Sequence, residues 1–247
     1  MIINYREPYW VKFQWDLSTH HDNQYVTEFN KSENKILTNF LYCENFIITC
    51  NFKIKDDYEG EDIRMIFGKS GKNIGLGYNK LNSELCFDFW TTDKTEDTYN
   101  NIAFKTVTKE DIENGVTITI VRNYDKITVY KNFEEDNYIN FENDFVNDYK
   151  RPGLFIGCCS PNPHENTFGG FTKMDINHFS IITKTSQIKY SKSIFEKETD
   201  VLLKNRYYED IICLYDFKTI NNLGIVYDES KYSNFLEKVP KEFITKF

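Results

Sequence analysis

The feature that most constrains the fold is a long succession of short segments in which apolar and polar residues alternate. Residues 45–55 show the pattern best, because every second position is apolar: Phe46, Ile48, Cys50, Phe52 and Ile54. Side chains two positions apart lie on the same face of a strand, so the pattern predicts a strand with one face in a hydrophobic core. Comparable segments continue to residue 183 with little helical periodicity. The sequence therefore predicts an all-β fold.

The order of these segments predicts the elements along the chain. Besides 45–55, we expect strands at 9–17, 63–68, 74–78, 85–91, 116–122, 126–132, 154–158, 171–183 and 211–217, and a short strand or link at 35–42. We expect polar loops at 93–101 and 133–150, a turn at 110–113 and a helix at about 193–205. Alternation places these residues in the core: Phe46, Ile48, Phe52, Leu85, Phe87, Ile118, Ile120, Ile156 and Phe179.

Composition limits the partners that the chain can have. The 247 residues are enough for one sizeable β domain, and 28% charged residues argue against disorder. The net charge is −8 and no Lys/Arg cluster stands out. Because phosphate binding needs a basic surface, we expect no nucleic-acid partner.

The sequence gives little indication of where the protein acts. No apolar run approaches the ~20 residues needed to span a bilayer, and the N-terminus lacks a basic segment followed by an apolar one. We expect no membrane insertion. The chain would be cytoplasmic, exported by another route, borne on a particle or part of a longer protein.

The six cysteines are predicted to be reduced and structural. Cys50 lies in phase with the apolar residues of its strand, so it is predicted to act as a small core residue. None of the six has the C-x-x-C spacing of a metal or redox site. One or two disulfides in an exported protein are the alternative.

Several phrases resemble a laminin G-like module in the expected order. Residues 45–52 look like its first core strand, and 115–122 followed by 126–132 look like its hairpin ending in Y-x-N-G. The segments 153–157 and 169–181 are similar to its closing strands. The resemblance implies a two-sheet antiparallel, jelly-roll-type, concanavalin A-like sandwich with a short helix and a C-terminal β extension. Phe133 replaces the glycine after the hairpin, so that turn is expected to differ.

The domain organisation follows from the extent of this resemblance. We expect a concanavalin A-like sandwich over 1–183, a helical connector over 184–210 and a C-terminal strand segment over 211–247. Residues 15–19 and 215–219 are alike and lie 200 positions apart, so the last segment could open a second module. Alternatively, it packs back onto the sandwich, with 9–17 as its expected partner.

No catalytic motif supports an enzyme. The chain has no H-E-x-x-H, G-x-S-x-G or P-loop pattern, and His178 is interpreted as a satisfied core or edge residue. Glycosidases need two carboxylates, ~5 Å apart in retaining enzymes. Glu84 and Asp88 share a strand face but should lie about 13 Å apart. We therefore expect no enzyme activity.

The resemblance instead implies a non-catalytic carbohydrate-binding or adhesion module. Candidate ligand-binding residues are Trp90, Asp88 and Glu84 on the outward face of strand 84–90, with Tyr78 and Arg64 on the same face. A ring beside carboxylates suits sugar stacking and hydroxyl recognition.

Two other functions stay open: a structural or interaction domain of a virion or appendage, and an accessory domain of a glycan-processing enzyme. A glycoside hydrolase is a further alternative. The partner would be a glycan or another protein, with assembly into an oligomer possible. No cofactor is expected, although Asp56, Asp57 and Asp62 offer oxygen ligands that calcium prefers. A solvated acidic turn is the simpler interpretation of that loop.

Overall fold

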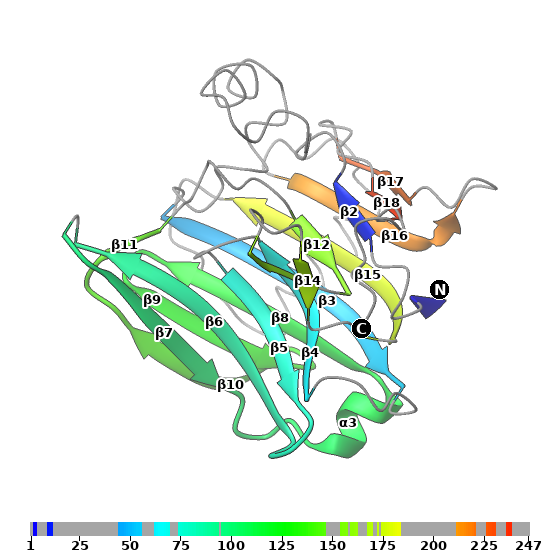
Figure 1. Cartoon of the computed structure of the whole chain (residues 1–247), viewed down its shortest axis with the longest axis horizontal. Helices are drawn as coiled ribbons and strands as arrows, with labels where there is room; N and C mark the ends of the chain where they lie inside the picture. Colours follow the sequence, from blue (N-terminus) through cyan, green and yellow to red (C-terminus); the bar gives the residue numbers. More distant parts are fainter. Residues whose placement is uncertain are drawn as a thin grey trace.

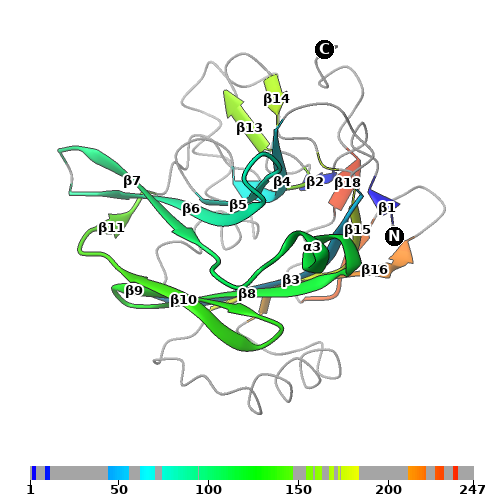
Figure 2. The same ribbon diagram turned by 90° about the horizontal axis from the view of Figure 1, so that it is seen from below.

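Two antiparallel β layers lie face to face and enclose most of the buried apolar side chains (Figures 1 and 2). The structure is a computed structural model. It describes residues 2–3, 9–11, 44–55, 62–69, 74–93, 95–146, 154–157, 159–162, 167–169, 172, 174–183, 211–220, 226–230 and 236–238. Three predictions lie outside these residues: the short strand or link at 35–42, the helix at 193–205 and the connector at 184–210.

The first layer consists of six strands in the spatial order β10-β9-β8-β3-β15-β16. Their bounds are Glu134–Asn140 (β10), Lys126–Lys131 (β9), Val116–Asn123 (β8), Asn45–Ile54 (β3), Met174–Thr183 (β15) and Ile211–Ile220 (β16). β1 (Ile2–Ile3) also pairs with β15.

The second layer has the order β12-β4-β5-β6, and β6 pairs with both β7 and β11. The bounds are Leu154–Ile156 (β12), Ile63–Lys69 (β4), Ile74–Asn79 (β5), Glu84–Thr92 (β6), Asp97–Ala103 (β7) and Asp144–Phe145 (β11). The hydrogen-bonded path passes from one layer to the other through β17 (Val226–Asp228), β18 (Leu236–Lys238) and β2 (Tyr9–Val11). β13 (Cys159–Asn162) and β14 (Thr167–Gly169) form a separate pair.

Strand register explains the core. Ile48 of β3 lies opposite Ile120 of β8 and Ile181 of β15, so one row of side chains points from three strands into the space between the layers. Phe67 of the second layer meets Phe179 of the first with ring centroids 5.2 Å apart. All nine predicted core residues are buried, so the prediction of an all-β antiparallel sandwich is confirmed.

The C-terminal segment is hydrogen-bonded to the main layers. β16 pairs with β15, and its Tyr215 lies fully buried opposite Phe179. The buried carboxylate of Asp228 accepts hydrogen bonds from the backbone N–H groups of Leu214 and Ser230, both at 2.9 Å, and from the Ser230 hydroxyl at 2.7 Å. β18 then pairs with β2. Residues from both ends of the chain therefore meet in one sheet.

The turn predicted at 110–113 is wrong, because α3 spans Lys109–Asn114. Thr108 caps this helix: its hydroxyl accepts from the Asp111 N–H, while the Asp111 carboxylate accepts from the Thr108 backbone. This reciprocal capping box stabilises the first turn, and Ile112 anchors the helix in the core. The Thr-x-x-Asp spacing was present in the sequence and marks the helix start.

Two predicted polar loops are strands instead. Residues 93–101 contain most of β7, and residues 133–150 contain β10 and β11. Of the β7 side chains only Ile102 is buried, and among the described strands β7 pairs only with β6, so apolar alternation could not indicate it. An edge strand needs only one partner, and the backbone ladder alone can hold a polar sequence there.

The expectation that Phe133 changes the hairpin turn is also wrong. β9 and β10 are joined by two residues, Asn132 and Phe133, with positive φ values of 47° and 70°. This is the geometry for which Asn-Gly is preferred. Phe133 therefore adopts the backbone conformation of a glycine, which costs on the order of 1–2 kcal/mol for such a residue. It packs in return against an apolar cluster on the outside of the first layer.

Candidate ligand-binding surface

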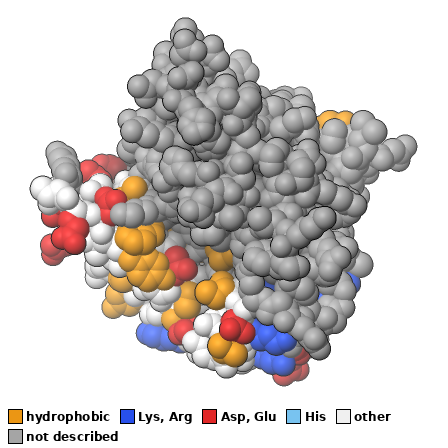
Figure 3. All heavy atoms as spheres, viewed as in Figure 1, with side chains coloured by type: hydrophobic (Ala, Val, Ile, Leu, Met, Phe, Trp, Pro, Cys, Tyr) orange, Lys and Arg blue, Asp and Glu red, His pale blue; other side chains and the backbone are white. Residues whose placement is uncertain are grey.

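The outward side of β6 is only partly buried, in contrast to its inward side. Burial alternates strictly along the strand, with Leu85, Phe87 and Phe89 in the core. Glu84 and Asp88 therefore project outward, as predicted for this strand. Trp90 projects to the same side. Figure 3 views this side of the molecule, where hydrophobic and acidic side chains gather together in the region of β6.

β7 adds two residues that the sequence analysis missed. Register places Tyr99 opposite Trp90 and Asn101 opposite Asp88, so all four side chains lie on the same side of the layer. The Tyr99 side chain is 51% exposed. The name open face is used below for Glu84, Cys86, Asp88, Trp90, Tyr99 and Asn101.

Asp88 is the centre of a hydrogen-bonded group. Its Oδ1 atom accepts from the Tyr99 hydroxyl at 2.7 Å and from the Asn101 amide at 2.6 Å. Partial burial is the main cause that raises the pKa of the Asp88 carboxyl, and the two hydrogen bonds oppose this rise. Burial and the nearby carboxylate raise the pKa of Tyr99 to about 12. The phenol therefore stays protonated and donates to Asp88 at neutral pH.

The two aromatic rings border this group. The ring centroids of Trp90 and Tyr99 lie 5.4 Å apart at an interplanar angle of 59°. At the other end of the face, Glu84 accepts a hydrogen bond from the Asn82 amide at 3.0 Å. Burial, together with the nearby Glu84 and Asp88 carboxylates, raises the pKa of the Cys86 thiol to about 11. The thiol is therefore not a reactive thiolate.

Arg64 and Tyr78 do not lie on the open face, which corrects their predicted position. Tyr78 of β5 lies opposite the inward-pointing Leu85, and Arg64 of β4 lies opposite Tyr78. Residues directly opposite each other share a sheet face. Both side chains therefore point between the layers and are buried, with exposed fractions of 4% for Arg64 and 6% for Tyr78. Arg64 and Tyr78 are thus in phase with Leu85 of β6, and not with Glu84 and Asp88 as predicted.

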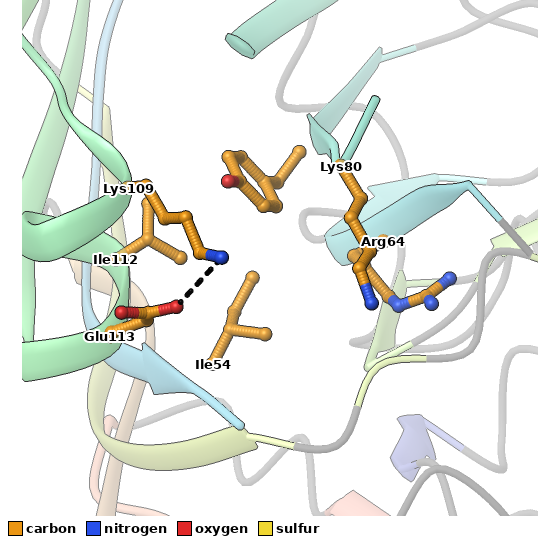
Figure 4. Close-up of a pocket in the computed structure, with 7 residues that line it drawn as sticks. Ile54, Arg64, Lys80, Lys109, Ile112 and Glu113 are labelled. Carbon is orange, nitrogen blue, oxygen red and sulfur yellow. Dashed lines mark ion pairs between the residues drawn. The ribbon is translucent and has the colours of Figure 1, made fainter. Parts of the chain in front are cut away.

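Arg64 and Tyr78 instead line a small pocket at one end of the sandwich. Figure 4 shows Arg64 and Lys80 on one side of it and Lys109 with Glu113 on the other. Lys109 Nζ lies 3.4 Å from the Glu113 carboxylate. Ile54, Ile112 and the Tyr78 ring supply apolar walls. Among the described residues that line it, three are basic and one is acidic, and it is called the positive pocket below.

The calcium candidates are only partly visible. Asp56 and Asp57 lie outside the described residues. Asp62 is exposed, and its backbone oxygen accepts from the Lys80 N–H at 2.8 Å. Within the described ranges, no group of three or more His, Cys, Asp or Glu side chains could hold a metal ion.

Cys50, Cys86 and Cys213 are free thiols.

His178 lies on the outside of the first layer. Its Nε2 atom is 3.0 Å from the Ser180 hydroxyl, and Asp216 lies opposite it on β16. Burial lowers the pKa of His178 to about 4, and the nearby Asp216 opposes this shift. The Ser180 side chain is only 2% exposed, so a substrate could not reach its hydroxyl.

The chain resembles solved binding domains only in its fold. No family model matches it, and no curated protein matches it. The structure titled "Crystal structure of botulinum neurotoxin serotype D binding domain" has a TM-score of 0.47 and 17% identity, over 66% of this chain and 39% of that one. The binding domain of botulinum neurotoxin DC in complex with rat synaptotagmin II gives 0.44 and 15%, over 69% and 38%.

A third similar structure is the CBM40 of a Ruminococcus gnavus IT-sialidase bound to alpha2,3 sialyllactose. Its TM-score is 0.43 with 10% identity, over 65% of this chain and 85% of that one. The chain thus spans about two fifths of the toxin domains' length. All three TM-scores are below 0.5.

None of the described helices is long and apolar enough to cross a membrane.

Proposed function

We propose that the protein is a non-catalytic carbohydrate-binding module and that glycans bind to the open face. The observation that supports this most is the Asp88 group: a carboxylate oriented by Tyr99 and Asn101 beside the Trp90 ring. A sugar has an apolar ring face and a polar rim of hydroxyl groups. Aromatic side chains can stack on the apolar face of the sugar, and an oriented carboxylate and amide can form hydrogen bonds with its hydroxyl groups.

The arrangement favours binding over catalysis. Hydrolysis of a glycosidic bond needs a second carboxyl group across the scissile bond from the first. The nearest outward carboxyl along β6 is Glu84, four positions away, which corresponds to about 13 Å in a strand. Both groups also extend from the same side of β6. We also propose that the module is of the laminin G-like type and that it acts in adhesion.

A glycan array followed by calorimetry tests the proposal. Tyr99→Ala and Trp90→Ala should each weaken binding of the selected glycan by about tenfold or more, because aromatic anchors dominate such contacts. Tyr138→Ala is the matched control, since Tyr138 is a similarly exposed tyrosine, at 54%, on the outside of the first layer. If no glycan binds, or the Tyr138 variant loses as much affinity as the Tyr99 variant, the proposal fails.

A protein partner is the second candidate for the same surface. The exposed Tyr99 beside Trp90 supports it, because tyrosine and tryptophan are enriched at protein interfaces. A structural or interaction domain would use these side chains without recognising sugars. Binding of a protein in the absence of any glycan binding, with loss of that binding in Tyr99→Ala, would favour this candidate.

A further inference from the structure

The charges of the open face all have one sign. The open face has two carboxylates, those of Glu84 and Asp88, at outward positions of β6. No lysine, arginine or histidine occupies an outward position on β5, β6 or β7 in the part of the chain that the structure describes. Lys94, between β6 and β7 in the sequence, lies outside the described residues, and the first basic residue after β7 is Lys105, two positions beyond the strand end. Lys80, which precedes β6, lines the pocket at the end of the sandwich instead.

The Asp88 carboxylate has one oxygen atom available for a ligand. Both of its hydrogen bonds, from Tyr99 and Asn101, go to Oδ1. Among the described residues, Oδ2 accepts none. The two donors hold the carboxylate in a fixed orientation, so Oδ2 would accept a ligand hydroxyl without further ordering of the side chain. Hydrogen bonds to an ionised acceptor are about twice as strong as neutral ones.

We infer that the open face selects neutral glycans and excludes acidic ones, an inference that rests on the proposed function. A neutral sugar can donate hydroxyl groups to Asp88 Oδ2 and stack on the aromatic rings. A sialic acid, uronic acid or sulfate group would place a negative charge beside the Asp88 carboxylate, on a surface that also carries Glu84. Like charges brought together at an interface weaken binding strongly, and no described cation on this face offsets them.

The positive pocket offers a second place where an acidic ligand could bind, distinct from the open face. Arg64, Lys80 and Lys109 lie at the end of the sandwich and between the layers, away from the outward side of β6. An acidic ligand bound there would depend on those three residues and not on Trp90 or Asp88. The residues on which binding depends therefore distinguish the two surfaces.

The test uses matched pairs of probes: lactose with 3′-sialyllactose, and other array oligosaccharides with their sulfated forms. The whole chain is titrated at about 50 mM and about 300 mM NaCl, since salt screens exposed charges. We expect each acidic member to bind at least about tenfold more weakly than its neutral partner at low salt. The ratio of the two dissociation constants, acidic to neutral, should be smaller at high salt.

Asp88→Asn keeps the shape of the side chain and removes its charge, so it should reduce the ratio between neutral and acidic binding. Glu84→Gln provides a second variant should Asp88→Asn fail to fold. Asp125→Asn is the control, because Asp125 is exposed in the turn between β8 and β9 and should not change the ratio. Equal or tighter binding of acidic members, with loss in Trp90→Ala, overturns the inference but leaves the proposed function standing. Absence of binding to every glycan removes the proposed function and the inference with it.

Discussion

The outer sides of the two layers differ sharply. On the second layer, the open face is only partly buried and includes carboxylates, an amide and two aromatic rings. On the first layer, the outer side includes an apolar cluster that is almost fully buried, which we call the covered face: Ile47, Val121, Tyr130, Ile182, Ile211 and Leu214. A buried polar row of Thr49, Thr119 and Ser180 lies beside it.

The burial pattern of single strands shows the difference. β6 alternates between buried and partly buried positions along its length, while β3 is buried at every position from Asn45 to Cys50. Continuous burial means that both sides of β3 contact other parts of the chain. A strand of that kind stabilises the fold but has no surface left for a ligand. The comparison therefore indicates the open face, and not the covered face, as the surface available for binding.

The largest expected effect on stability is the difference between substitutions on the inward and outward sides of β6. Phe87→Ala should lower the free energy of unfolding by about 3–5 kcal/mol, because it leaves a cavity where a fully buried ring contacted Phe89. Glu84→Gln, on the opposite side of the strand, should change it by less than about 0.5 kcal/mol. Denaturant unfolding measures both. A loss below about 1 kcal/mol in Phe87→Ala would contradict the register of β6.

The second prediction compares the two outer sides. Leu214→Ala on the covered face should cost about 2–4 kcal/mol, as expected for a leucine that is 1% exposed. Tyr99→Ala on the open face should cost below about 1 kcal/mol, because half of its surface already contacts water. Similar losses in thermal unfolding would mean that the two outer sides are equally covered.

The third prediction concerns pH. His178 has a folded-state pKa of about 4, against about 6.5 in an unfolded chain, so the unfolded state binds the proton more tightly. The contribution of neutral His178 is therefore complete above pH 6.5 and is lost as the pH falls towards 4. The wild type should lose about 1–3 kcal/mol more than His178→Gln across this window. Parallel stability curves for the two proteins would show that the folded state does not lower the pKa of His178.

The smallest expected effect is that of Asp88→Asn on stability. The folded state raises the pKa of this carboxyl, so the protonated form is favoured and stability should increase as the pH falls through the folded-state pKa. Asparagine removes the cost of the buried charge and keeps an oxygen for Tyr99 and Asn101. The variant should be slightly more stable than the wild type at neutral pH and less dependent on pH. A clear destabilisation, absent in Asp125→Asn, would show that the charge stabilises the open face.

The candidate site shows how far the sequence alone could lead. The period-two pattern of β6 predicted correctly that Glu84 and Asp88 point outward. It could not indicate Tyr99 and Asn101, because β7 is an edge strand with a single buried side chain and so lacks an apolar pattern. It also misplaced Arg64 and Tyr78, since a charged or phenolic side chain gives no indication of which side of a sheet it occupies.

By itself, the sequence determined the fold class, the core and the phase of the most regular strands. These depend on local alternation, because burial of every second side chain is the main stabilising term in a sheet. Only the tertiary structure decided which neighbours lie across the sheet: Tyr99 and Asn101 beside Asp88, Arg64 beside Tyr78, and β18 beside β2. Strand pairing joins residues far apart in the chain through backbone hydrogen bonds that are nearly the same for every residue type, so the local sequence holds little record of the partner.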